Sequence, residues 1–227
     1  MANDGIADEG KEEREFLGKE KPEIEHLSDL IFGLALSIGA LVLISQPPRS
    51  STEIITDVIS FSFSFFLLIE IWLHYTAAMA VMKVESISFI RLNVVLLFLV
   101  SLEPYFFFLL SSGPKTVGDI RIDDTASMLY AFDLGALFVI LAFFSDRIAK
   151  SDHDKVHAAE VRQHGVYRAM FYSSGVILLA SALPFFWEIT VYGYPLRYYF
   201  WAGSVILIAV GSWYAGRIFH SQSDRSY

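Results

Sequence analysis

The chain has 227 residues, of which 54% are hydrophobic and 19% are charged, and its formal net charge is −8. Soluble domains usually carry about 25% charged residues, and the apolar residues here fall in long blocks, so the composition excludes a soluble globular enzyme. The acidic balance argues against nucleic-acid binding, which requires a basic surface. The absence of cysteine excludes disulfides, thiolate metal sites and thiol catalysis.

The N-terminal segment, residues 1–25, differs from the rest of the chain. It holds nine acidic and four basic residues, which is more than half of the net charge. It is not a signal peptide, because no apolar core follows a basic start. The composition predicts an acidic cytosolic N-terminal tail that is mobile or loosely helical.

Six apolar runs follow, each near the length of about 20 residues that a helix needs to cross a bilayer. Every backbone amide in lipid needs a partner within its own segment, so the runs are expected to be helices. The sequence thus predicts an all-α membrane protein with six transmembrane helices in a domain over 26–220, followed by a short C-terminal tail, 221–227. The predicted spans are 27–46, 54–79, 89–111, 126–144, 166–187 and 196–219.

Proline positions predict several of the boundaries. Pro47-Pro48 ends the first run, Gly113-Pro114 follows the third, and Tyr194-Pro195 precedes the sixth. Pro104 and Pro184 lie inside spans three and five, where each removes one helical hydrogen bond and predicts a kink.

The 17 Lys and Arg residues predict the orientation in the membrane. Thirteen of them fall in the N-terminal tail, the 80–91 and 145–168 regions and the C-terminal end, whereas the opposite loops hold only Arg49, Lys115, Arg121 and Arg197. Basic residues are retained on the cytosolic side, so both termini are predicted to be cytosolic. An aromatic cluster at the start of span six is typical of a membrane interface and comprises Tyr192, Tyr194, Tyr198, Tyr199 and Trp201.

Ionisable residues at membrane depth are costly and are functional candidates by default. Asp29 opens span one, where Ser28 and Asp29 could instead cap the helix. Glu70 and His74 are four residues apart and share one helix face. They could pair with each other, pair with Asp29 if spans one and two pack together, or lie hydrated near the headgroups.

Two more carboxylates complete this set. Glu103 precedes Pro104 near the outer end of span three, where a hydrated position is expected. Asp133 lies well inside span four, and facing lipid there would cost roughly 2.5–3.5 kcal/mol. Asp133 is therefore expected to face protein or water.

The first span carries an apolar stripe at helical spacing. Leu34, Ile38 and Leu41 lie on one face, and Ser37 borders them. Small residues, which let helices approach closely in lipid, occupy other positions of the same span and are Gly33, Ala35, Gly39 and Ala40. Spacing alone leaves open whether the stripe faces lipid, the core or a pore.

The stretch Ile24–Ser37 resembles the first helix of the transmembrane protein 175 family of potassium channels. That family's signature is R-x-x-x-F-S-D before an apolar helix. Ser28 and Asp29 match it, Leu27 stands where Phe is usual, and Glu23 stands where Arg is expected. The order of residues downstream is also similar, with Ser64-Phe65, Trp72, His74, Asn93 and Pro104 in the next two spans.

The resemblance implies a function and a set of site residues. Prokaryotic members are six-span subunits that assemble as tetramers, and their first helices line the pore. It implies a potassium-permeable channel with Leu34 at an apolar constriction, Ile38 and Leu41 in the next layers, and Ser37 as a hydroxyl layer. It also implies a polar network at the cytosolic side made of Ser28, Asp29, Trp72, His74 and Asn93.

Two alternatives remain open from the residues themselves. A proton-coupled secondary transporter would use Glu70, His74, Glu103 and Asp133 as a proton relay, although paired broken helices and inverted repeats are not visible in the sequence. A membrane enzyme or metal-binding sensor would use His153, His157, Glu160 and His164 of the loop after span four, although a solvated linker is the more common interpretation of such a pattern. The prediction is a non-enzymatic channel with potassium as the permeant ion, without cofactor or metal, whose partners are the bilayer and further copies of itself.

Overall fold

Six long helices dominate the part of the chain that the structure describes, as predicted. The computed structural model describes residues 2–45, 50–82, 87–111, 116–117, 120–150, 158–192 and 194–223. The long helices are α1 (Ala2–Ser45), α2 (Ser51–Val81), α3 (Ile87–Ser111), α4 (Ile122–Ala149), α5 (Ala158–Ser181) and α7 (Leu196–Ser223). They confirm the all-α class.

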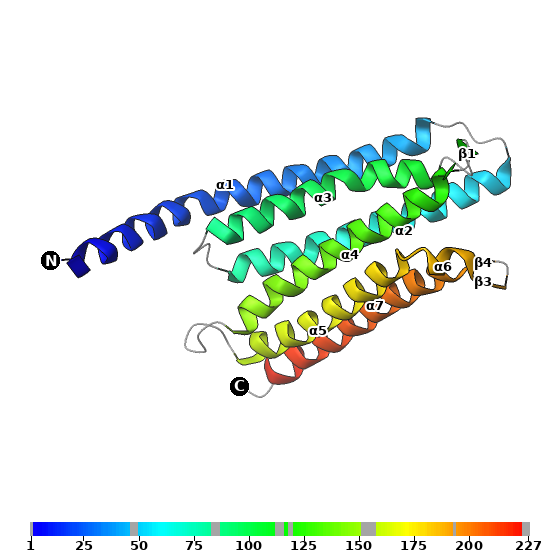
Figure 1. The fold of residues 1–227 in the computed structure, drawn as a ribbon. Helices are drawn as coiled ribbons and strands as arrows, with labels where there is room; N and C mark the ends of the chain where they lie inside the picture. The colour runs from blue at the N-terminus through cyan, green and yellow to red at the C-terminus, as the bar shows by residue number, and fades with distance from the viewer. Residues whose placement is uncertain are drawn as a thin grey trace.

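The helices run alternately up and down, so both termini lie at the same end of the bundle (Figure 1). The opposite end carries two small antiparallel hairpins and a single helical turn, α6 (Phe185–Glu188). One hairpin pairs β1 (Thr116–Val117) with β2 (Ile120–Arg121), and the other pairs β3 (Thr190–Val191) with β4 (Tyr194–Pro195). The cytosolic placement of the termini stays a prediction from the Lys and Arg distribution.

Five helices of the described chain are long and apolar enough to span a membrane, which defines an integral, multi-pass membrane protein. They cover Pro22–Ser45, Ser51–Val81, Ser88–Leu110, Asp124–Ala149 and Leu196–Arg217. Helix α5 is the exception, because polar and charged residues occupy its first turns and the helix stops at Ser181. It packs between α4 and α7, which also run the length of the bundle.

Several predicted boundaries are confirmed. Helix α1 ends at Ser45, before Pro47-Pro48, and α3 ends at Ser111, before Gly113-Pro114. Helix α7 begins immediately after Pro195. The predicted span 166–187 is interrupted at Pro184, but the interruption is a break rather than a kink, because α5 ends at Ser181 and Pro184 precedes the separate turn α6. Proline lacks the N–H that a continuing helix requires and restricts the residue before it.

The N-terminal segment is helical and runs directly into the first span, so α1 begins at Ala2 and passes through Pro22. Of the two states expected for this tail, the structure shows the helical one. Its cytosolic location and the separate roles of the segments 1–25, 26–220 and 221–227 stay predictions.

Helix α4 forms the centre of the bundle. It packs against α5 on one side and against α3 and α2 on the other, while α5 packs against α7, and α1 against α3 (Figure 1). Leu134, Leu137, Phe138 and Leu141 of α4 are almost fully buried. This central helix therefore joins the group α1, α2 and α3 to the group α5 and α7.

Candidate pore helix and its polar contacts

Helix α1 presents a continuous apolar stripe to its surroundings. Its members recur every three or four residues, which places them on one helix face. Each exposes between 42% and 78% of its surface in the single chain, and they are Leu27, Leu30, Leu34, Ile38, Leu41 and Ile44. Leu34, Ile38 and Leu41 were singled out from the sequence, whereas the same spacing also identifies Leu27, Leu30 and Ile44.

The opposite face of α1 is held against the bundle. Phe32 and Ala35 are buried there, and the Phe32 ring packs on the Tyr75 ring with 5.6 Å between centroids. Because α1 is held along this face, the stripe is directed away from its own subunit. In a bilayer, the stripe must therefore be covered by lipid, by another subunit or by a pore.

Ser37 lies within the exposed face of α1. Its hydroxyl donates a hydrogen bond to the Gly33 carbonyl at 2.7 Å, one helical turn back. The hydroxyl proton is therefore engaged locally, while the oxygen keeps acceptor capacity on an otherwise apolar face.

A polar cluster ties α1 to α2 and α3 at the end of the span nearer the N-terminus. The Trp72 indole N–H donates to Asp29 Oδ1 at 2.9 Å. The Ser28 hydroxyl donates to the Ile24 carbonyl at 2.7 Å and lies 2.6 Å from the Tyr75 hydroxyl. Since the Ser28 proton is used on Ile24, Tyr75 is the donor to Ser28. Asn93 of α3 interacts with the same Tyr75 hydroxyl.

The structure brings together four residues of the predicted network, namely Ser28, Asp29, Trp72 and Asn93. Sequence analysis missed Tyr75, although a tyrosine one turn after Trp72 shares its helix face and a buried hydroxyl needs a partner. The alternative that Ser28 and Asp29 cap a helix is wrong, because α1 has already run for many residues before them. Their oxygens serve contacts between helices instead.

His74 does not join this network. It faces α5, where its ring meets those of Tyr167 and Phe171 edge-on at 4.7 and 4.8 Å between centroids. Its Nδ1 lies 2.9 Å from the Glu70 carbonyl oxygen and 3.5 Å from Glu70 Oε1. His74 lies apart from the network because it is two residues after Trp72, so the two side chains point to different sides of α2.

Glu70 belongs to a second polar group, between α2, α5 and α7. Its Oε1 accepts a hydrogen bond from the Ser212 hydroxyl at 2.9 Å. Of the alternatives left open by the sequence, the structure shows Glu70 beside His74, whereas Asp29 accepts from Trp72. A cleft of about 340 Å³ opens here, lined by Glu70, His74, Gln163, His164, Tyr167, Ser212 and three apolar side chains.

The described residues give little support to the hypothesis of a metal-binding loop. His153 and His157 lie outside them, and His164 is buried in α5. Among the residues that the structure describes, no three His, Asp or Glu side chains are grouped so that they could hold a metal ion.

Glu103 and Asp133 are both buried inside the bundle, where they interact electrostatically. The expected hydrated position of Glu103 is wrong, because the side chain is only 1% exposed and accepts a hydrogen bond from the Ser64 hydroxyl at 2.8 Å. The turn of α3 that carries it faces α2 and α4 rather than the membrane surface. Asp133 is also 1% exposed, which confirms that it faces protein.

The aromatic cluster at the start of α7 is divided. Tyr192, Tyr198 and Tyr199 are exposed, as an interfacial position requires. Trp201 instead turns inward and donates its indole N–H to the Ser181 hydroxyl at 3.0 Å. Only part of the cluster is therefore available to the interface.

These features define a multi-pass helical membrane protein with an exposed apolar first helix. No family model matches the sequence, and no curated protein matches it. In fold, the chain resembles the crystal structure of a homologue, from Chamaesiphon minutus, of the lysosomal potassium-selective channel TMEM175. The TM-score is 0.55 at 16% sequence identity, over 88% of this chain and 98% of that one. The likeness, to a channel rather than an enzyme, confirms at the level of the fold the resemblance seen in residues 24–37.

Proposed function

We propose that this chain is the subunit of a cation channel, permeable to potassium, whose pore is lined by α1 from several copies. The observation that carries the proposal is the apolar stripe of α1, which is directed away from a subunit that holds the opposite face of the same helix. The fold likeness to a potassium-selective channel supports it.

The stripe supplies the side chains that such a pore needs. A ring of Leu or Ile side chains narrows a pore and closes it by dewetting. Leu34 is the proposed constriction, Ile38 and Leu41 are the adjacent layers, and Ser37 provides a hydroxyl next to them. Potassium gives up its water more readily than sodium, so an apolar neck favours potassium modestly.

The proposed assembly is a homotetramer around a fourfold axis. Closed rotational symmetry is the common solution for homo-oligomers, and it would gather four copies of α1 at the axis. The polar cluster of Ser28, Asp29, Trp72, Tyr75 and Asn93 would then fix the angle of each α1 relative to its own subunit. Asp29, which is exposed, would add negative charge near one mouth and concentrate cations there.

The test is planar-bilayer recording of the purified protein in opposed potassium and sodium gradients. Leu34→Ala and Leu34→Asn are compared with the parent, and Ile206→Asn serves as the matched control because Ile206 is an equally exposed aliphatic residue on α7. Leu34→Asn is expected to raise open-channel conductance several-fold and to reduce potassium preference, because a polar ring stays wet. Ile206→Asn is expected to conduct like the parent.

Each outcome decides something specific. A current that is the same in the Leu34 variants as in the parent, but that changes in Ile206→Asn, would refute α1 as the pore helix. The absence of current in a correctly folded, oligomeric preparation under every voltage and pH would refute the channel itself. Cross-linking of the membrane-embedded protein that stops at dimers would refute the tetramer.

Proton-coupled transport is the second candidate, supported by the burial of Glu103 and Asp133. It predicts uphill potassium accumulation in vesicles when a pH gradient is imposed. A channel predicts only dissipative flux, so the two functions separate in one flux assay.

A further inference from the structure

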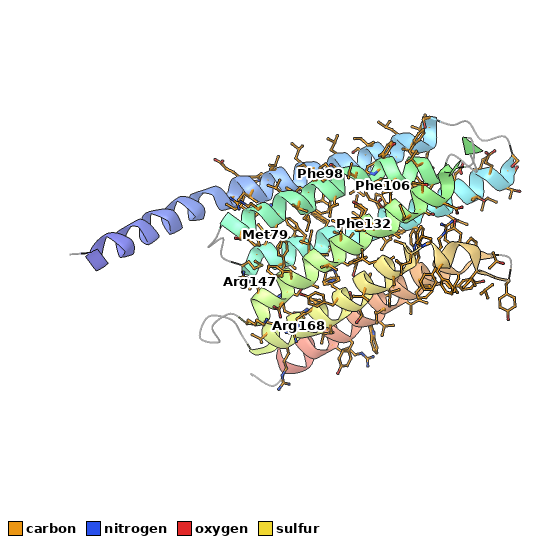
Figure 2. All side chains as sticks on the ribbon, viewed as in Figure 1. Met79, Phe98, Phe106, Phe132, Arg147 and Arg168 are labelled. Atoms are coloured by element: carbon orange, nitrogen blue, oxygen red, sulfur yellow. The ribbon has the colours of Figure 1, made fainter. Side chains whose placement is uncertain are left out.

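Two acidic side chains are buried together between α3 and α4. Glu103 and Asp133 each expose only 1% of their surface, and they interact electrostatically. Phe106, one turn from Glu103, and Phe132, directly before Asp133, mark this part of the bundle on the side toward the hairpins (Figure 2). Neither carboxyl takes part in the proposed pore.

The oxygens of this pair are poorly matched with donors. Ser64 of α2 donates to Glu103 Oε1 at 2.8 Å. Glu103 Oε2 and both oxygens of Asp133 have no hydrogen-bond partner within the described part of the chain. The Tyr130 hydroxyl is the other polar group that interacts with Glu103. Buried polar atoms are normally paired, and an ionised carboxylate offers about four acceptor sites. Two ionised carboxylates would therefore lack the donors that they need.

Within the described part of the chain, no opposite charge lies beside the pair. The polar groups that interact with the two carboxyls are Ser64 from α2, Tyr130 from α4 and the carboxyls themselves. From α7, the Trp201 ring packs on Tyr130 at 5.3 Å between centroids, and its N–H is directed to Ser181 of α5. Among the described residues, no Lys, Arg or His side chain interacts with either carboxyl. The neutralising charge must therefore come from a bound cation or a proton.

We propose that Glu103 and Asp133 form a proton-binding site, in which at least one carboxyl holds a proton at neutral pH and thereby removes the charge repulsion between the two. Protonation converts one unpartnered oxygen into a donor and removes a buried charge in the same step. A metal cation such as Ca²⁺ would instead need six to eight oxygen ligands arranged around it. The proposal does not depend on the channel function.

The proposal gives a definite sign to the effect of pH on stability. A folded chain that keeps a proton which the unfolded chain releases loses stability as the pH rises. For each retained proton, the equilibrium constant for unfolding increases by up to about tenfold per pH unit. The double variant Glu103→Gln with Asp133→Asn keeps the shape and donor capacity of the protonated pair, so this pH dependence is expected to disappear in it.

The first measurement is infrared spectroscopy of the full-length protein at several pH values between about pH 6 and about pH 9, with the spectrum of the double variant subtracted. A carbonyl stretch of a protonated carboxylic acid is expected in the parent, with a shift in D₂O. It should be lost in the double variant and kept in the control Asp57→Asn, because Asp57 is a partly exposed residue two turns before Ser64. This measurement reads protonation directly, even in a variant of low stability.

The second measurement is the melting temperature over the same pH range, in sodium, potassium or calcium salts. The parent and Asp57→Asn are expected to melt at falling temperature as the pH rises, with no preference among the cations, and the double variant is expected to show a flat profile. A protonated-acid band that is absent from the parent would overturn the proposal. Stabilisation by one particular cation that vanishes in the double variant would also overturn it and identify a metal site.

Discussion

Helices α1 and α4 read alike as sequences, yet they occupy opposite environments. Both contain a stretch apolar enough to span a membrane, but 22% of that stretch is buried within the subunit in α1 and 67% in α4. The difference teaches that hydropathy identifies a span without saying what covers it. The apolar side chains of α4 are covered by the subunit itself, whereas those of α1 must be covered by lipid, by another subunit or by a pore.

The largest effect is expected at the start of α4, where Arg197 of α7 donates to Asp124 Oδ1 at 2.8 Å. The arginine side chain is 4% exposed. Arg197→Ala is expected to destabilise the fold by about 3–5 kcal/mol, because it leaves the Asp124 carboxylate without this guanidinium. Melting of the purified protein measures the loss.

The matched control is Arg147→Ala, at the other end of α4. The Arg147 guanidinium lies over the Phe143 ring at 5.3 Å on an exposed face (Figure 2). Its removal is expected to change stability by less than about 1 kcal/mol. Equal losses in the two variants would contradict the view that α4 depends on its buried contacts.

An intermediate effect is expected where α4 meets α5. A Cβ added at Gly175 would lie 2.9 Å from Val139 Cγ2 and 3.0 Å from the Gly135 carbonyl oxygen. Gly175→Ala is therefore expected to cost about 1–3 kcal/mol through overpacking, as measured by thermal melting.

The corresponding glycine-to-alanine substitution in α1 is expected to increase the stability of the subunit rather than to reduce it. A Cβ at Gly33 would meet nothing within 4 Å in the subunit, so Gly33→Ala should stabilise the isolated subunit by up to about 1 kcal/mol through helix propensity. A large loss of subunit stability in Gly33→Ala would mean that α1 is more enclosed than the structure shows.

An effect as small as that of Gly33→Ala is expected at the contact between α1 and α2. Tyr75→Phe removes the hydrogen bond to Ser28 and keeps the buried ring that packs on Phe32. A loss of about 1 kcal/mol is expected, which is the usual net value of one hydrogen bond. Melting of Tyr75→Phe beside Tyr105→Phe, at an exposed position of α3, isolates the buried contact. Matching values for both variants would mean that Ser28 and Tyr75 do not hold α1.

Much of the candidate site follows from helical spacing. The stripe through Leu34, Ile38 and Leu41 required only the period of a helix, and the joining of Ser28, Asp29, Trp72 and Asn93 followed from the family resemblance. His74 was assigned to the same cluster, but its position two residues after Trp72 directs it to α5. Glu103 was expected to be hydrated, since depth along a helix does not reveal which neighbour covers a given turn.

By itself, the sequence determined the class of the protein, the number of long helices and most of their ends. These depend on local chemistry, namely the length of apolar runs, the missing N–H of proline and the need of backbone amides for partners within lipid. Only the tertiary structure decided that Glu103 and Asp133 are buried where they interact electrostatically, that Tyr75 holds Ser28 and that α4 rather than α1 lies at the centre. These facts depend on how helices rotate and pack against one another, and in lipid close packing and polar contacts rather than hydropathy decide that.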